Sequence, residues 1–213
     1  RIGNLIAIAA RSGIDPSMNS TLAMAIEKAK QANMPAANIQ RAIDRVADKN
    51  AAVLEETTYE GMGPGGVGII IETATDNKNR TFPEVRSALT KNGGRVADSG
   101  SVTFQFSRKG VIRVAATGED ALLTVLDAGA EDAIEEDGEI IVYTELKDLA
   151  KVRQAIIDAG LTVQEADLQY IPNAPVTIED PEVAARVLKL LDALDDLDDV
   201  VGVHTNADIA VEV

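Results

Sequence analysis

The sequence has no cysteine, no tryptophan and a single histidine among its 213 residues. Without cysteine there can be no disulfide, thiolate zinc site or cysteine nucleophile. A single histidine also excludes most histidine-based metal sites and Ser-His-Asp triads. No apolar run approaches the roughly 20 residues that span a bilayer, and there is no basic-then-apolar leader. We therefore expect a cytoplasmic protein with no membrane contact, cofactor, metal or catalytic residue.

Positive charge is in the minority: the chain has 20 Lys and Arg against 35 Asp and Glu, and its formal net charge is −15. Taken whole, this charge argues against a nucleic-acid-binding protein. The charge is uneven, however, with +3 in residues 1–50, 0 in 51–110, −10 in 111–171 and −8 in 172–213. Such asymmetry indicates that one part of a chain contacts a polyanion. We expect the domain centres to lie farther apart than the Debye length of about 8 Å, so that the acidic half does not cancel the basic half.

The basic side chains of the first half are the candidate nucleic-acid contacts. In the first segment they are Arg1, Arg11, Lys28, Lys30, Arg41 and Arg45. In the second they are Lys78, Arg80, Lys91, Arg95, Arg108 and Lys109. The alternative is ordinary solvated surface, where most Lys and Arg residues lie.

The spacing of apolar residues predicts an α+β protein with three domains. Residues 1–52 show helical periodicity, with N-cap signals at Asp15-Pro16 and Asn19-Ser20, and predict an N-terminal helical domain. Residues 111–171 spell strand–helix–strand–strand–helix–strand, the ferredoxin-like order, with a hairpin at Asp137-Gly138. Residues 53–110 and 172–213 each contain a strand–helix–strand unit too small to bury a core alone. We expect these two segments to combine into one discontinuous ferredoxin-like sandwich, into which the acidic domain is inserted.

A glycine-rich run at residues 61–66 matches G-x-G-x-x-G only formally. The dinucleotide fingerprint needs a helix after the glycines, so that phosphate meets its N-terminus. Here a strand is predicted at residues 67–73, and Pro64 removes one amide donor. The run therefore favours a structural turn over a phosphate cradle.

Alternation at residues 102–106 predicts a second strand with Phe104 and Phe106 on one face. Exposed aromatic side chains beside basic residues stack bases in RNA-binding domains. Large apolar side chains usually lie inside, however, and three Phe in the whole chain are few. We therefore expect both rings in the core.

Two polar features in the last segment have plain structural interpretations. The acidic run Asp192, Asp195, Asp196, Asp198 and Asp199 lacks the EF-hand spacing and favours a solvated face, with a docking surface for a basic partner as the alternative. His204 has no partner motif and is expected to be a structural residue, not a general base. No Ser or Lys stands in a nucleophile motif, so nothing in the sequence indicates an enzyme.

Several segments in order along the chain carry a family resemblance. They lie at residues 9–16, 25–30, 33–43, 59–67, 75–86, 92–94, 100–102, 128–132 and 191–196, and include Glu60-Gly61-Met62-Gly63-Pro64-Gly65-Gly66 and Thr75-Asp76-Asn77-Lys78-Asn79-Arg80. Together they resemble the YebC/PmpR family. The resemblance implies a three-domain, non-catalytic, cytosolic-type factor, and members are described as DNA-binding transcriptional regulators or as translation factors that assist ribosomes at difficult stretches. It also implies a short basic segment before Arg1, and since the sequence opens inside a predicted helix, we expect a truncated or processed chain.

The sequence therefore predicts a non-enzymatic regulator of gene expression that contacts DNA through basic residues of its N-terminal and middle domains. One alternative is a ribosome-associated translation factor that binds RNA and relieves stalling. A further alternative is a small-molecule sensor, because βαββαβ domains often bind amino acids at their interfaces. The acidic half could additionally meet a basic protein partner.

Overall fold

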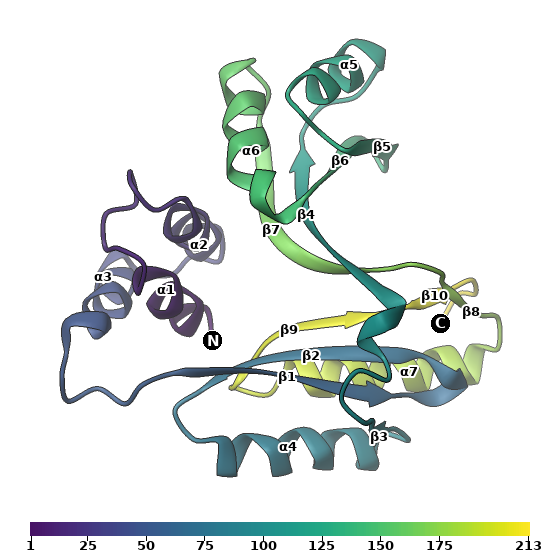
Figure 1. Ribbon diagram of the computed structural model, residues 1–213. Coiled ribbons are helices and arrows are strands. Elements are labelled where there is room, and N and C mark those ends of the chain that lie inside the picture. The colour runs from purple at the N-terminus through teal and green to yellow at the C-terminus, as the bar shows by residue number, and fades with distance from the viewer.

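The buried apolar side chains form three large clusters and one small one, rather than a single core. The computed structural model describes all residues 1–213. Figure 1 shows a helical unit beside two sheet-containing units that are stacked one above the other. The α+β fold class with several antiparallel sheets is confirmed.

Three short helices make up the N-terminal unit: α1 (Ile2–Ala10), α2 (Ser20–Gln31) and α3 (Ala36–Asp44), with a 3-10 turn η1 (Arg45–Ala47) after them. Asn19 caps α2 as its sequence position predicts, since its side chain accepts a hydrogen bond from the Leu22 amide at 3.1 Å. Ile6 and Leu22 are fully buried, Ile39 and Ile43 are nearly so, and the other buried members of the cluster are alanines.

The middle unit is built from two stretches of chain that are far apart in sequence. Its four-stranded sheet has the order β3-β1-β2-β9, and its pairs are antiparallel. The strands are β1 (Glu55–Met62), β2 (Gly68–Thr75), β3 (Arg95–Val96) and β9 (Val200–Thr205). Two helices, α4 (Lys78–Lys91) and α7 (Pro181–Asp195), cover one face of this sheet (Figure 1). Leu89 of α4 and Leu190 of α7 meet the sheet in one buried cluster, so the two segments do share a core.

The acidic unit has the ferredoxin-like topology that its sequence predicts. Its sheet order is β5-β6-β4-β7, antiparallel throughout. The elements are β4 (Phe106–Val114), α5 (Glu119–Asp127), β5 (Asp132–Glu136), β6 (Glu139–Thr144), η4 (Leu146–Asp148), α6 (Leu149–Asp158) and β7 (Val163–Pro172). Asp137 and Gly138 both have positive φ in the β5–β6 hairpin, as this dipeptide predicts. The long paired strands β4 and β7 run past the predicted limits at 110/111 and 171/172 and connect this unit to the middle one.

Two details differ from the sequence-based predictions. The strand expected at residues 102–106 is wrong, because η3 (Thr103–Gln105) occupies most of it and β4 begins only at Phe106. Hydrogen bonds from the backbone amides of Val102 and Thr103 go to the Glu60 carboxylate instead of to a neighbouring strand. Finally, β8 (Val176–Ile178) does not join the four-stranded sheet but pairs in parallel with β10 (Ala207–Ile209).

Candidate nucleic-acid interface

Arg80 is held at the surface of the middle unit by a buried carboxylate. Its guanidinium donates to both oxygens of Asp199, with Nη2 to Oδ1 at 2.8 Å and Nε to Oδ2 at 3.1 Å. The Thr81 hydroxyl donates to the same carboxylate at 2.7 Å. Burial alone raises the pKa of Asp199, but the hydrogen bonds from Arg80 and Thr81 and the Arg80 charge outweigh it and bring the pKa below its ordinary value. Arg80 therefore joins α4 to the loop before β9.

The acidic run that contains Asp199 is only partly a solvated face. Asp199 is 4% exposed, so the expectation for that residue is wrong. The Asp195 carboxylate forms an ion pair with the guanidinium of Arg1, and this pair connects the start of α1 to the end of α7. Asp192, Asp196 and Asp198 are exposed and carry no ion pair, as predicted.

Ion pairs also hold the N-terminal unit against the acidic unit. Lys28 of α2 lies 3.1 Å from Asp167 and 3.6 Å from Glu165 of β7. Arg153 of α6 pairs with Glu27. The expectation that the acidic half leaves the basic half uncancelled is therefore wrong for Arg1, Lys28 and Arg80, because folding brings carboxylates within bonding distance of them.

Three further candidates are paired on the surface. Lys78 lies 3.0 Å from Glu55, and Lys109 lies 2.7 Å from Glu131. Arg108 lies over the Tyr170 ring, 5.3 Å from its centroid, with a guanidinium nitrogen 3.8 Å from Glu72. These ion pairs lie at the surface and each contributes little to stability, but each already gives its cation an anionic partner.

Four candidates in the N-terminal unit have no carboxylate partner. Lys30 and Arg41 are exposed on α2 and α3. Arg11 and Arg45 instead donate to the carbonyls of Leu54 and Ala52, where they attach the helices to the segment that leads into β1. Lys30 and Arg41 are thus the free cations here, whereas Arg11 and Arg45 have a structural task.

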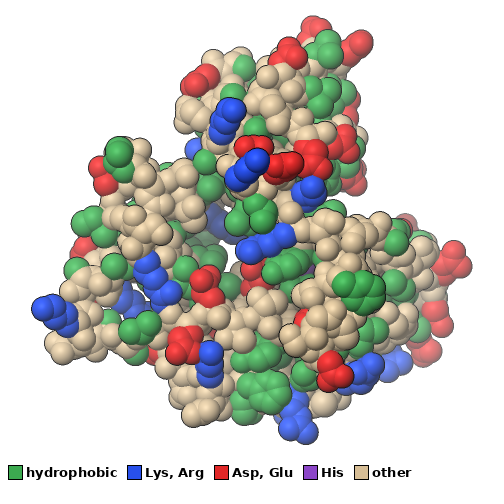
Figure 2. Space-filling model, viewed as in Figure 1, with side chains coloured by type: hydrophobic (Ala, Val, Ile, Leu, Met, Phe, Trp, Pro, Cys, Tyr) green, Lys and Arg blue, Asp and Glu red, His purple; other side chains and the backbone are tan.

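The C-terminal end of α4 carries the other group of free cations. Lys91 and Arg95 flank the turn at Gly93, are exposed and pair with no carboxylate. Arg186 of α7 reaches the same turn, since a Cβ built on Gly93 would lie 2.9 Å from its Nη2 atom and 3.5 Å from Pro64. Figure 2 shows blue side chains at this lower right end of the molecule. We call Lys91, Arg95 and Arg186 the α4-end cluster.

Counting charge along the sequence missed Arg186, together with the exposed and unpaired Arg86 and Lys189. Arg186 and Lys189 lie in a segment of net charge −8, which concealed them. Their spacing of three on an amphipathic helix was the available signal, because such residues share a face.

His204 belongs to a polar junction between the middle unit and the strands that carry the acidic one. Its Nε2 lies 2.5 Å from Glu72 Oε1, and its ring lies 5.3 Å from that of Tyr170. Gly202 leaves room for this pair, since a Cβ there would lie 2.9 Å from the Glu72 carboxylate. This placement agrees with the structural role predicted for His204.

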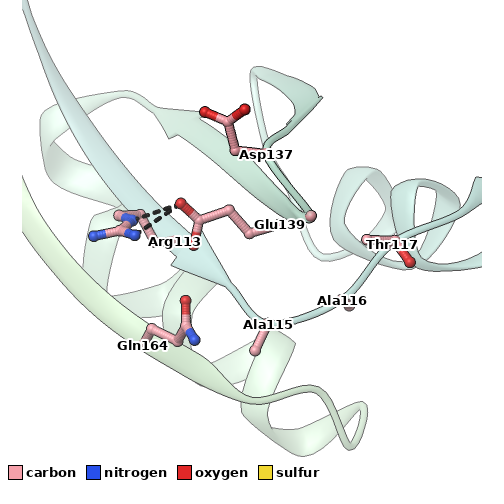
Figure 3. Close-up of a pocket in the computed structure, with 8 residues that line it drawn as sticks. Arg113, Ala115, Ala116, Thr117, Asp137, Glu139 and Gln164 are labelled. Carbon is pink, nitrogen blue, oxygen red and sulfur yellow. Dashed lines mark hydrogen bonds and ion pairs between the residues drawn. The ribbon is translucent and has the colours of Figure 1, made fainter.

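An open polar hollow of about 630 Å³ lies at one end of the acidic sheet. Figure 3 shows Arg113 and Glu139 facing each other there, with Gln164, Asp137 and the 115–117 loop around them. Arg113 is bonded to Glu139 at 2.9 Å, and that hydrogen bond and charge raise the pKa of Arg113. Arg113 also reaches Glu165 at 3.4 Å, so the hollow presents an already neutralised cation. It offers little to a metabolite that needs a counter-charge.

The structure contains no cluster of three or more His, Cys, Asp and Glu side chains arranged to hold a metal ion. No helix in it combines the length and the apolar character needed to cross a bilayer.

Comparison with known proteins identifies the family. Residues 1–49 match the family model described as the TACO1/YebC protein N-terminal domain, and residues 54–207 match the TACO1/YebC second and third domain. The chain belongs to the TACO1/YebC family. The resemblance in its motifs is therefore confirmed.

Relatives in this family are similar over nearly the whole chain. A probable transcriptional regulatory protein of Moorella thermoacetica is 46% identical, covering 98% of this chain and 86% of the relative. One of Frankia casuarinae is 47% identical, covering 98% and 85%. The crystal structure of a conserved hypothetical protein of Aquifex aeolicus superimposes with a TM-score of 0.90 at 40% identity, covering 100% of this chain and 89% of that one. At the level of the family, these relatives support a regulatory protein.

Proposed function

We propose that this TACO1/YebC-family protein is a non-enzymatic regulator of gene expression that binds DNA through free basic side chains of its N-terminal and middle units. The names of its relatives support transcriptional regulation. The observation that carries the proposal is the distribution of Lys and Arg residues without a carboxylate partner. Apart from Lys151, all of them lie in residues 1–50 or in the middle unit: Arg11, Lys30, Arg41, Arg45, Lys49, Arg86, Lys91, Arg95, Arg186 and Lys189.

This distribution matters because phosphate contacts need cations that are not already neutralised. A cation that binds phosphate releases counter-ions from the nucleic acid, and this release provides most of the sequence-independent affinity. Arg80 and Lys28 are engaged by carboxylates within the fold, whereas Lys30, Arg41 and the α4-end cluster project into solvent. We therefore narrow the twelve sequence candidates to Lys30, Arg41, Lys91 and Arg95, and we add Arg186.

The test is the salt dependence of binding to a DNA duplex, measured by fluorescence anisotropy. Each lost phosphate contact should lower the slope of log K against log salt by about 0.9. Two double variants test the two groups of cations: Lys30→Gln/Arg41→Gln and Lys91→Gln/Arg95→Gln. Each should lower the slope by up to about 1.8, because each removes two cations at about 0.9 per phosphate contact.

Lys151→Gln is the matched control, because Lys151 is exposed, unpaired and on the acidic unit. It should bind like the wild type. If both double variants keep the wild-type affinity and slope, or if Lys151→Gln lowers the slope equally, the proposed interface is wrong.

Ribosome-associated translation control remains the second proposal, and the same cations would then contact ribosomal RNA. Replacing the duplex by an RNA hairpin of the same length in the anisotropy assay compares the two directly.

A further inference from the structure

Phe104 is displayed on the surface, although the sequence placed it in the core. Its side chain is 71% exposed, whereas Val102 and Phe106 on either side of it are buried against Ile70. The expectation for Phe104 is therefore wrong and that for Phe106 is right. The 3-10 turn causes the difference, because it turns the residue between two buried neighbours outward.

The turn that displays Phe104 is firmly anchored on its N-terminal side. The Glu60 carboxylate, only 6% exposed, accepts hydrogen bonds from the backbone amides of Gly100 at 2.5 Å, Val102 at 2.9 Å and Thr103 at 2.7 Å. Burial opposes the charge of Glu60, but these amide hydrogen bonds outweigh burial and lower its pKa. The carboxylate is therefore ionised at neutral pH and holds the loop as an internal anion would.

The C-terminal side of the turn is anchored as well. The Asn173 amide donates to the Gln105 carbonyl at 2.8 Å. The Gln105 side chain accepts from Asn206 at 2.9 Å, and Asn206 in turn accepts from the Gly68 amide at 2.7 Å. An aromatic ring held this way loses little conformational entropy when a partner stacks on it.

Free positive charge lies on the same face of the sheet. Arg95 pairs in register with Met62, and Glu60 stands two residues before Met62 on β1. Side chains two apart on a strand share a face, and so do those of paired residues. Arg95 therefore emerges on the face that the Phe104 turn covers, whereas Lys91 and Arg186 belong to the helices on the other face. A ring for a base and a guanidinium for a phosphate are the two elements by which proteins hold single-stranded nucleic acids.

We infer that Phe104 is a stacking residue for an unpaired base of a single-stranded nucleic acid whose backbone contacts Arg95. The inference rests on the proposed function and deepens it, since it names the form of nucleic acid that this end of the middle unit takes. The shared chemistry is an unstacked base on a phosphodiester chain, which either RNA or DNA provides.

The absence of Trp from the chain makes a direct test available. The variant Phe104→Trp places a single indole at the proposed stacking position, and its emission should be quenched by a 12-mer of deoxythymidine or of uridine. The two oligonucleotides distinguish DNA from RNA, and a 12-base-pair duplex, which exposes no unpaired base, should leave the emission unchanged.

Phe82→Trp is the matched control. Phe82 is also exposed, at 39%, but it lies on α4 on the opposite face of the sheet, against Tyr59. Its replacement should show no quenching with either 12-mer. Equal quenching at both positions would overturn the inference, because it would indicate non-specific contact.

Affinity supplies the second readout. Phe104→Leu should weaken binding of a single-stranded 12-mer by about 5- to 100-fold, the range expected for one lost stacked base. The slope of log K against log salt should not change, because no cation is removed, and the thermal midpoint should match the wild type since the ring is exposed. Phe104→Trp should bind at least as tightly as wild type.

The outcomes separate this inference from the proposed function. If the wild type binds single strands and Phe104→Leu binds them within twofold as well, the stacking role is wrong and the proposed function stands. Binding of the wild type to the duplex alone would likewise contradict the stacking role and leave the proposed function intact. If the wild type binds neither form even at low salt, the proposed function itself fails.

Discussion

The two ends of helix α4 carry basic side chains in opposite situations. At the N-terminal end, Arg80 is bonded to the buried Asp199 and Lys78 to Glu55. At the C-terminal end, Lys91 and the nearby Arg95 and Arg186 face solvent without a carboxylate partner. This difference shows that a basic residue is free to bind a ligand only where folding has not already paired it with a carboxylate. One end of the helix stabilises the fold, and the other is free to bind.

The largest expected effect is the loss of the anion at the N-terminal end. Asp199→Asn removes the charge that accepts from Arg80 and Thr81, and it should lower the free energy of unfolding by about 2 kcal/mol. Urea unfolding followed by circular dichroism measures this change. The control Asp198→Asn alters an exposed residue without a partner and should stay within about 0.5 kcal/mol of wild type. Equal effects of the two variants would contradict the anchoring role.

Acid should weaken two anchors of the fold: Asp199 at this end of α4, and Glu60 beneath the Phe104 turn. The pKa of Asp199 lies below its ordinary value of 3.8 in the folded protein, and that of Glu60 lies below 4.5. Their stabilisation is therefore complete above the ordinary values and is lost as pH falls toward the lowered ones, because the unfolded chain takes up protons first. Urea unfolding from pH 7 to pH 3 should show this fall, and Asp199→Asn should show a shallower one. Parallel curves would remove Asp199 from the explanation.

Gly93 tests the geometry of the C-terminal end. Its φ of +80° is unfavourable for a residue with a Cβ, so Gly93→Ala should cost about 1 kcal/mol of unfolding free energy. It should also displace Arg186, whose guanidinium occupies the space of the new methyl group. Gly160→Ala, just after α6 on the acidic unit, is the control, since its φ is +88° with nothing within 4 Å of the new Cβ. Both variants should lose similar stability, but only Gly93→Ala should weaken nucleic-acid binding; unchanged binding would place Arg186 outside the interface.

The smallest expected effects on stability are those of changing Lys78 and Lys91. An exposed ion pair is worth little, so Lys78→Gln and Lys91→Gln should each change the unfolding free energy by less than about 0.5 kcal/mol. Binding should separate them, because only Lys91→Gln should lower the salt slope, by about 0.9. The reverse result in the anisotropy assay would exchange the roles of the two helix ends.

Local chemistry made much of the fold predictable. The Asn19 cap, the Asp137-Gly138 hairpin and the βαββαβ order of the acidic unit depend on a few neighbouring residues or on apolar spacing, and all are observed. The joining of two distant segments into one middle unit was also predictable, because neither could bury a core alone. The strand expected at residues 102–106 is wrong. The alternation of Val102, Phe104 and Phe106 resembles that of a strand, but the Glu60 carboxylate accepts hydrogen bonds from the amides of Val102 and Thr103.

The candidate site was less predictable, for an electrostatic reason. Counting charges along the chain correctly drew attention to the first half, but it included Arg1, Lys28 and Arg80, whose partners come from residues 165–199. It also omitted Arg186, which lies among acidic residues in sequence and beside Gly93 in space. Charge per segment averages over the contacts that determine which cation is free.

The family, the helical start, the acidic ferredoxin-like unit and the basic bias of the first half were predictable from the order of residues, because each depends on composition, periodicity or motifs within a continuous stretch. The neutralised basic residues, the burial of Asp199 and the exposure of Phe104 became visible only in the folded chain. These properties depend on groups more than a hundred residues apart or on competition between a carboxylate and a neighbouring strand for the same amides. Burial and electrostatics act through distance in space, which the order of residues does not contain.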